Sequence, residues 1–189
     1  MRIPHGSLAV LLCALSAGAA LAQSTATSTV TKTPGITFSY DAQHDQVIPN
    51  GVQLKPAATG AAITPTTGTV VVTINITAAS HFPRGTSYHC SVVAVGGELD
   101  TTNAVVSGGI DTAFGVAHST GANTFSCKLT IPYEWTILPD PAATRGAILA
   151  FGVAAVEDGN VVRSTLQADG VEPLPPDGTT STFSFNVTL

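Results

Sequence analysis

Strict two-residue alternation of apolar and polar side chains is the feature that most constrains this chain. It runs through residues 69–77, 123–131 and 182–189. In the second of these segments, NTFSCKLTI, phenylalanine, cysteine, leucine and isoleucine fall on one face and polar residues on the other. Successive side chains of a strand point to opposite faces, so each segment is predicted to be a strand with one buried face. The pattern favours antiparallel sheets packed face to face.

Further segments extend the prediction to seven to nine strands. Residues 36–40, ITFSY, alternate in the same way, and the short apolar pieces Ala104–Val106 and Ala113–Val116 are candidate edge strands. Residues 147–156, AILAFGVAAV, are apolar on both faces, which is typical of a central strand or of a short helix. The turn residues at 157–160 favour the strand, continued as a hairpin. Charged residues make up only 10% of the chain, which also favours an all-β fold.

The order of these strands is similar to that of immunoglobulin and fibronectin type III domains. Val70–Ile76 resembles the B strand of that family and Phe151–Val156 the F strand. The resemblance implies an immunoglobulin-like antiparallel β-sandwich over most of the chain, and it carries over no function. The cysteine–tryptophan–cysteine order of antibody domains is absent, because Trp135 follows both of the later cysteines.

The N-terminal residues 1–22 predict a secretory signal peptide. Arg2 is followed by a run of apolar residues and then by alanines, with cleavage expected between Ala22 and Gln23. Cys13 lies too early in this segment to serve as a lipid anchor. We therefore expect a secreted or periplasmic protein, of bacterial origin by the style of the segment. No later apolar run approaches the roughly 18 residues of a membrane-spanning helix.

The remainder of the chain is expected to form a flexible polar lead at 23–34 and a single domain at 35–189. Of the seven Lys and Arg residues, Arg2 lies in the signal segment, against twelve Asp and Glu in the whole chain. A scattered acidic balance argues against binding to nucleic acid or to anionic membranes.

Two cysteines, Cys90 and Cys127, remain after signal removal and are predicted to form a disulfide. Cys127 lies on an apolar stripe, and Cys90 shares its face with Val92, so both point toward the core. A catalytic thiol or a metal ligand is the less favoured alternative, because a reactive cysteine needs partial exposure and a positive neighbour. His89 must point away from Cys90 and is expected at the rim or in solvent.

Sites for catalysis or cofactors have little support. The chain has no nucleophile elbow, phosphate loop or dinucleotide-binding motif, so we predict no enzyme, no catalytic residue and no cofactor. His44, His81 and His118 are weak metal candidates that lack ligand spacing. The loop acids, a conceivable calcium site, are expected to be solvated: Glu98, Asp100 and Asp111.

These observations leave three functional hypotheses. The first is a non-enzymatic β-sandwich with a structural or protein-interaction role, binding a protein or cell-surface partner through the 96–122 or 169–180 connection. The second is a fimbrial or surface-assembly subunit, because length, signal, single disulfide and composition are similar to those of pilins joined by strand donation. Its cysteines lie mid-chain, however, and its lead is too polar for a donor strand. The third is a periplasmic protein that binds a small ligand or a metal.

Overall fold

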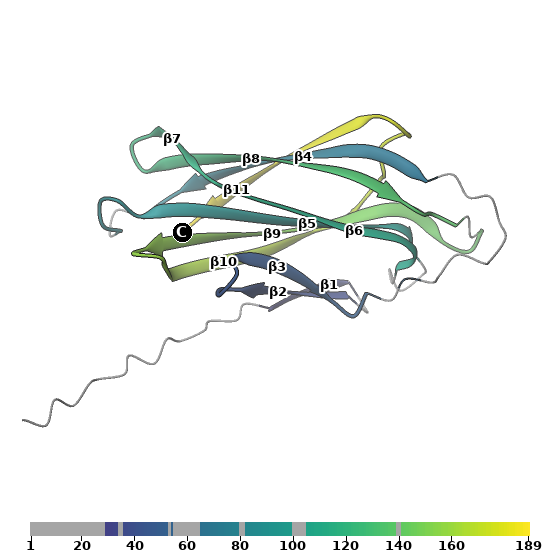
Figure 1. The fold of residues 1–189 in the computed structure, drawn as a ribbon, viewed down its shortest axis with the longest axis horizontal. Helices are drawn as coiled ribbons and strands as arrows, with labels where there is room; N and C mark the ends of the chain where they lie inside the picture. Colours follow the sequence, from purple (N-terminus) through teal and green to yellow (C-terminus); the bar gives the residue numbers. More distant parts are fainter. Residues whose placement is uncertain are drawn as a thin grey trace, which may run out of the picture.

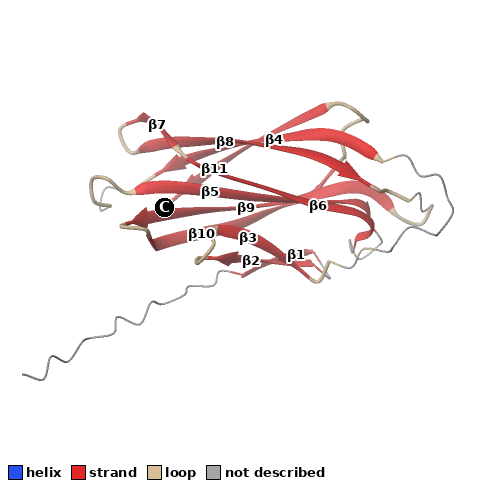
Figure 2. Cartoon of the chain, in the orientation of Figure 1, coloured by secondary structure: helices blue, strands red, loops and turns tan. Residues whose placement is uncertain are grey.

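The computed structural model describes residues 29–33, 36–52, 54, 65–79, 82–99, 105–138 and 141–189. These residues contain strands and connecting turns but no helix, and therefore none that is long and apolar enough to cross a membrane (Figure 2). The predicted all-β class is confirmed. The strands outnumber the seven to nine expected: β1 (Thr29–Thr33), β2 (Ile36–Asp41), β3 (Gln46–Asn50), β4 (Thr66–Thr77), β5 (Ser87–Leu99), β6 (Val105–Val116), β7 (His118–Gly121), β8 (Thr124–Trp135), β9 (Thr144–Glu157), β10 (Asn160–Glu172) and β11 (Thr180–Thr188).

The strands form three stacked sheets (Figure 1). We name them the cover sheet, β1-β2-β3; the middle sheet, β10-β9-β5-β6; and the far sheet, β11-β4-β8-β7. The middle sheet lies between the other two, and a separate hydrophobic core fills each of its two interfaces. The chain is therefore a three-layer structure, whereas the alternation had predicted sheets packed face to face without a third layer.

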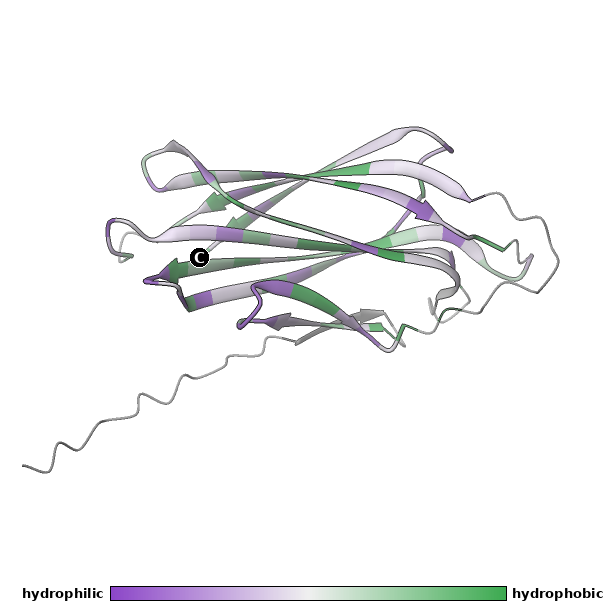
Figure 3. Cartoon of the chain, viewed as in Figure 1, coloured by the Kyte–Doolittle hydropathy of each residue, from purple (hydrophilic) through white to green (hydrophobic). Residues whose placement is uncertain are grey.

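Burial on both faces explains the composition of the two central strands, β5 and β9, along which Figure 3 shows hydrophobic residues. In β5, Cys90 and Val92 face the far sheet, while Val93 and Val95 face the cover sheet. β9 is buried in the same way from Gly146 to Val156. The prediction that residues 147–156 form a central strand is confirmed, as is the hairpin that joins β9 to β10.

The far sheet contains the cleanest alternation in the sequence. β4 and β8 pair antiparallel in unbroken register, with Ile74 opposite Cys127. β11, in contrast, pairs with β4 in parallel, which departs from a purely antiparallel sandwich. The carboxylate of Asp177 accepts hydrogen bonds from the backbone N–H of Thr67, at 2.6 Å, and from its hydroxyl, at 3.1 Å. This contact holds the start of β11 beside the start of β4, so the two strands run in one direction.

The cover sheet differs most from expectation. Residues 29–33, which fall within the range assigned to a flexible lead, form β1 and pair antiparallel with β2. The connection at 96–122 was expected to be mainly loop with two short edge strands. Its described part instead contains the end of β5, the long edge strand β6 and the short β7. These segments form strands because neighbouring strands provide hydrogen-bonding partners, although their own sequence shows no clear strand pattern.

Candidate functional site

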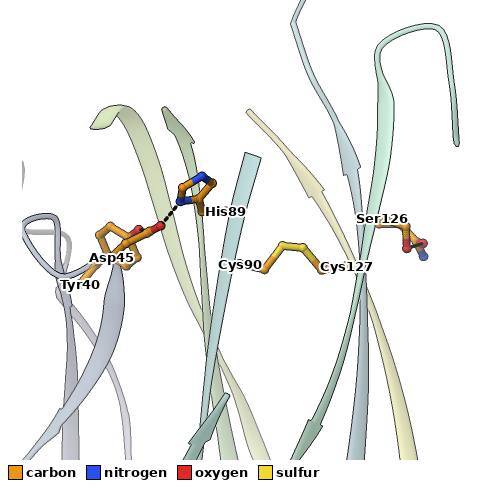
Figure 4. The surroundings of a disulfide bond; sticks show 7 residues. Tyr40, Asp45, His89, Cys90, Ser126 and Cys127 are labelled. Carbon is orange, nitrogen blue, oxygen red and sulfur yellow. Dashed lines mark hydrogen bonds and ion pairs between the residues drawn. A yellow bond between two sulfur atoms is a disulfide. The ribbon is translucent and has the colours of Figure 1, made fainter. Parts of the chain in front are cut away.

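The sequence TSYHCSVVAV, residues 86–95, carries the two features from which the site is built. The predicted disulfide is confirmed: Cys90 bonds Cys127 across the middle and far sheets, with a Cα–Cα distance of 6.4 Å. His89 leaves β5 on the opposite side, toward the cover sheet (Figure 4). Neighbouring side chains of a strand point to opposite faces, so no shared His–Cys centre exists here.

His89 is partly buried, in keeping with the rim position that the sequence allowed rather than with a fully solvent-facing one. Its Nδ1 is hydrogen-bonded to a carboxylate oxygen of Asp45, which belongs to the turn between β2 and β3. Asp45 has a φ of 54°, a left-handed conformation that aspartate tolerates better than most residues. The hydroxyl of Tyr40 donates to the second carboxylate oxygen. The cover sheet therefore supplies the partner that leaves the His89 side chain only 29% exposed.

The imidazole of His89 continues the chain of hydrogen bonds. A carboxylate only accepts hydrogen bonds, so the shared proton lies on Nδ1 and a neutral ring leaves Nε2 as an acceptor. Nε2 is 3.2 Å from the hydroxyl oxygen of Ser87, two residues earlier on the same face of β5. The same hydroxyl lies 3.4 Å from the carbonyl oxygen of Val156. The single hydroxyl proton can serve only one of these two acceptors.

The environment of Asp45 alters its acidity. Partial burial beneath the sheet raises the pKa of the Asp45 carboxyl, and the hydrogen bond and charge of His89 offset part of this rise. The carboxyl is therefore a weaker acid than a solvated aspartate. Its hydrogen bond to His89 places this carboxyl directly against β5.

A second polar contact lies two residues further along β5. The backbone N–H of Val47 donates to the hydroxyl of Ser91 at 2.8 Å, and Ser91 is buried. Together the Asp45–His89 and Val47–Ser91 contacts form what we call the interlayer latch. It fixes β3 over β5 through hydrogen bonds, which have directions, rather than through apolar contacts alone.

Beside the latch, the surface is hollowed into a recess of about 310 Å³. Its walls come from the β2–β3 turn, from β5 and from β6, with these lining residues: His44, Asp45, His89, Cys90, Phe114, Gly115 and Val116. Phe114 is 81% exposed and Val116 is 54% exposed, although both are large and apolar. The recess thus joins a polar floor at His89 to an uncovered apolar rim on β6.

Two of the three predicted metal candidates, His44 and His118, fall within the described residues. His44 is exposed and bonds Asp41 through Nδ1 at 2.5 Å, and His118 is exposed on β7 of the far sheet. His81 and the expected cleavage residues, Ala22 and Gln23, lie outside the described residues. Within the described ranges no three metal-binding side chains cluster.

Two of the three loop acids, Glu98 and Asp111, were wrongly expected to be solvated, because they lie on strands. Glu98 is 6% exposed on β5 and its Oε1 is 3.5 Å from the Nε of Arg145, directly opposite on β9. Asp111 accepts a hydrogen bond from the indole N–H of Trp135 at 2.5 Å. Asp100 lies outside the described residues.

Sequence reasoning missed the Asp45–His89–Ser87 arrangement. Asp45 is 44 residues from His89, so no local pattern joins them. One available signal was the apolar pair Val93 and Val95, which shares the His89 face of β5 and requires that this face be covered.

No family model matches this chain, and no curated protein or solved structure resembles it closely enough to count as a match.

Proposed function

We propose that this chain is a secreted or periplasmic protein with a protein-interaction role, and that the recess beside β6 is its contact surface. The observation that carries the proposal is the exposure of Phe114, at 81%, on the rim of a defined hollow. A large aromatic side chain left in water is unfavourable, and clusters of such residues mark interaction sites. The polar floor at His89 supplies hydrogen bonding for orientation, as central contacts at interfaces require.

Export of the chain is part of this proposal. The N-terminal signal pattern and the pairing of Cys90 with Cys127 both suit an oxidising compartment. N-terminal sequencing of the exported protein is expected to begin at Gln23. Recovery of the chain with residues 1–22 still attached would contradict this part of the proposal.

An immunoglobulin-like relationship of the two larger sheets is also proposed. β4 and β9, the strands compared with B and F, lie in the far and middle sheets respectively, as in that family. The disulfide differs, because it joins β5 to β8 rather than the B-like to the F-like strand. An experimental structure with β4 and β9 in one sheet would contradict the relationship.

Site-specific photocrosslinking tests the interaction role. Benzoylphenylalanine would replace Phe114 in the exported chain, and the same group at Thr130, exposed on β8, would be the matched control. We expect a protein adduct at position 114 that is absent at position 130. The captured partner would then be purified, and Phe114→Ser is expected to weaken its binding about tenfold or more. Equal adducts at both positions, or unchanged binding by the variant, would refute the role.

One observation favours a second candidate function, that of an acyl hydrolase. The carboxylate–imidazole–hydroxyl order of Asp45, His89 and Ser87 has the connectivity of a serine-hydrolase triad. Against it, Ser87 is not among the residues that line the recess, and its hydroxyl has Val156 as a competing acceptor. Hydrolysis of p-nitrophenyl acetate that is lost in Ser87→Ala but retained in Ser119→Ala would favour this function. Equal rates would remove it.

A further inference from the structure

We propose that β6 pairs antiparallel with β6 of a second copy of this chain, so that the middle sheets of two protomers join into one continuous sheet. This inference rests on the proposed interaction role of the recess and names its partner. β6 is a terminal strand of the middle sheet, paired with β5 along one side only. The single further bridge in its described backbone joins Gly108 to Thr136, at one end.

The direction of the free backbone groups follows from one hydrogen bond. The N–H of Ala117 donates to the carbonyl of Tyr88 at 2.7 Å, so these residues form a hydrogen-bonded pair. Such pairs alternate with non-bonded pairs along an antiparallel ladder. In the observed register, Val116 and Phe114 therefore direct their N–H and C=O groups away from β5, as do Thr112 and Ile110. These four residues present a ready ladder to an added strand.

The side chains of the same four residues are all exposed on the outer face of β6. Phe114 and Val116 are joined there by Ile110, which is 38% exposed. None of the four carries a charge. The one acid of this stretch, Asp111, points to the inner face, where Trp135 holds its carboxylate. An incoming strand therefore meets an apolar face with no repelling charge.

Most other edge strands carry features that prevent strand addition, whereas the one charged residue of β6, Asp111, is held on the inner face by Trp135. Charged residues, prolines and shortness all protect edges. β10 carries Arg163 and Asp169, β3 carries Pro49, and β7 is only four residues long. β11 presents serine, threonine and asparagine on its exposed face. Among these strands, β6 is the one whose exposed face carries large apolar side chains, Ile110, Phe114 and Val116, and no charge.

A second copy fits this edge because β6 is complementary to itself. With Thr112 opposite Thr112 of the second copy, the outward groups of both strands form hydrogen-bonded pairs about a two-fold axis. Phe114 then lies opposite Ile110 of the second copy, an aromatic–β-branched pair that stabilises sheets. Asp111 falls opposite Ala113, so the two carboxylates do not face each other. This register satisfies backbone, apolar and charge requirements together over residues 110–114, and the bridge of Gly108 to Thr136 ends the ladder beyond them.

Sedimentation equilibrium of the exported chain over a concentration series tests the pairing. We expect a dimer whose Kd rises about tenfold or more in Thr112→Pro, which removes an outward N–H, and in Phe114→Ser. Thr112→Ala keeps the N–H and is the matched control, with a Kd close to that of the parent chain. A chain that stays monomeric throughout overturns the pairing, whereas the crosslinking at position 114 still decides the interaction role.

Two further outcomes separate the proposals. If Phe114→Ser weakens the dimer but Thr112→Pro does not, the copies contact each other through the apolar face, and strand pairing is overturned while the interaction role stands. If Thr112→Pro fails to fold, Thr112→Cys replaces it, with Thr130→Cys as control. A short bismaleimide is expected to link position 112 to its counterpart and to leave position 130 unlinked. No link at position 112 overturns the proposal.

Discussion

Asp45 and His89 are hydrogen-bonded between the cover and middle sheets, although 44 residues separate them in the chain. The contact places a carboxyl group from an exposed turn against a strand that is buried on both faces. The pKa of the Asp45 carboxyl therefore depends on how the cover and middle sheets stack. The same contact forms the floor of the recess.

Replacing Asp45 with asparagine is expected to change how stability depends on pH. Because burial raises the folded-state pKa of Asp45 above its ordinary value of 3.8, the folded protein binds this proton more tightly than the unfolded chain. The resulting stabilisation is present below pH 3.8 and is lost as the pH rises through the folded pKa. Urea unfolding from pH 3 upward should therefore show Asp45→Asn gaining stability relative to the parent chain as the pH rises.

Asp177→Asn is the control with the opposite sign. Hydrogen bonds from the backbone and side chain of Thr67 lower the pKa of Asp177 below 3.8. Its stabilisation is present above pH 3.8 and is lost as the pH falls through the folded pKa. The disadvantage of Asp177→Asn should thus be largest at neutral pH and shrink in acid. Parallel pH profiles for the two variants would contradict both assignments.

Removing the disulfide through the double change Cys90→Ala and Cys127→Ala is expected to destabilise the fold. The bridge closes a loop with a sequence separation of 37, which in the chain-entropy model is worth roughly 3–4 kcal/mol. Urea unfolding of the variant against the oxidised parent measures the difference. Thiol titration under denaturing, non-reducing conditions supplies the check, since two free thiols in the exported parent would show that the bridge does not form.

Gly109→Ala is expected to lower the free energy of unfolding by about 1–3 kcal/mol, the usual cost of overpacking. A Cβ at position 109 would lie 2.1 Å from Cδ1 of Trp135, so the indole must move. Fluorescence of this single tryptophan during urea unfolding reports both the shift and the stability. Gly170→Ala, where a Cβ meets open space, is the control and should leave both unchanged. Equal behaviour of the two variants would argue against the close contact.

Tyr133→Phe is expected to leave stability unchanged or to raise it by up to about 1 kcal/mol. The hydroxyl of Tyr133 is buried and has no hydrogen-bond partner in the described structure, so its removal relieves an uncompensated polar group. Tyr40→Phe is the matched control, because the Tyr40 hydroxyl donates to Asp45, and this variant should lose about 1 kcal/mol. A comparable loss in Tyr133→Phe would reveal a partner for its hydroxyl.

The sequence by itself determined the strands with clear alternation and their inner faces, while it missed β1 and most of β6. Alternation around Cys127 and Val72 predicted buried stripes that the far sheet confirms, and the same rule placed Cys90 in the core with His89 on the other side. It also identified β9 as central, because only a strand covered twice can be apolar on both faces. These are local properties, because the polarity of each side chain matches whether that side chain is buried or exposed.

Only the tertiary structure decided what covers each face. The cover sheet over Val93, the parallel placement of β11 and the bond of Asp45 to His89 all depend on how sheets stack and connect. Alternation of apolar and polar residues shows which face of a strand is buried. It does not show which strand covers that face, because any apolar surface would bury it equally well. For the same reason, the unpaired edge of β6 can be identified only once the pairing of all the other strands is known.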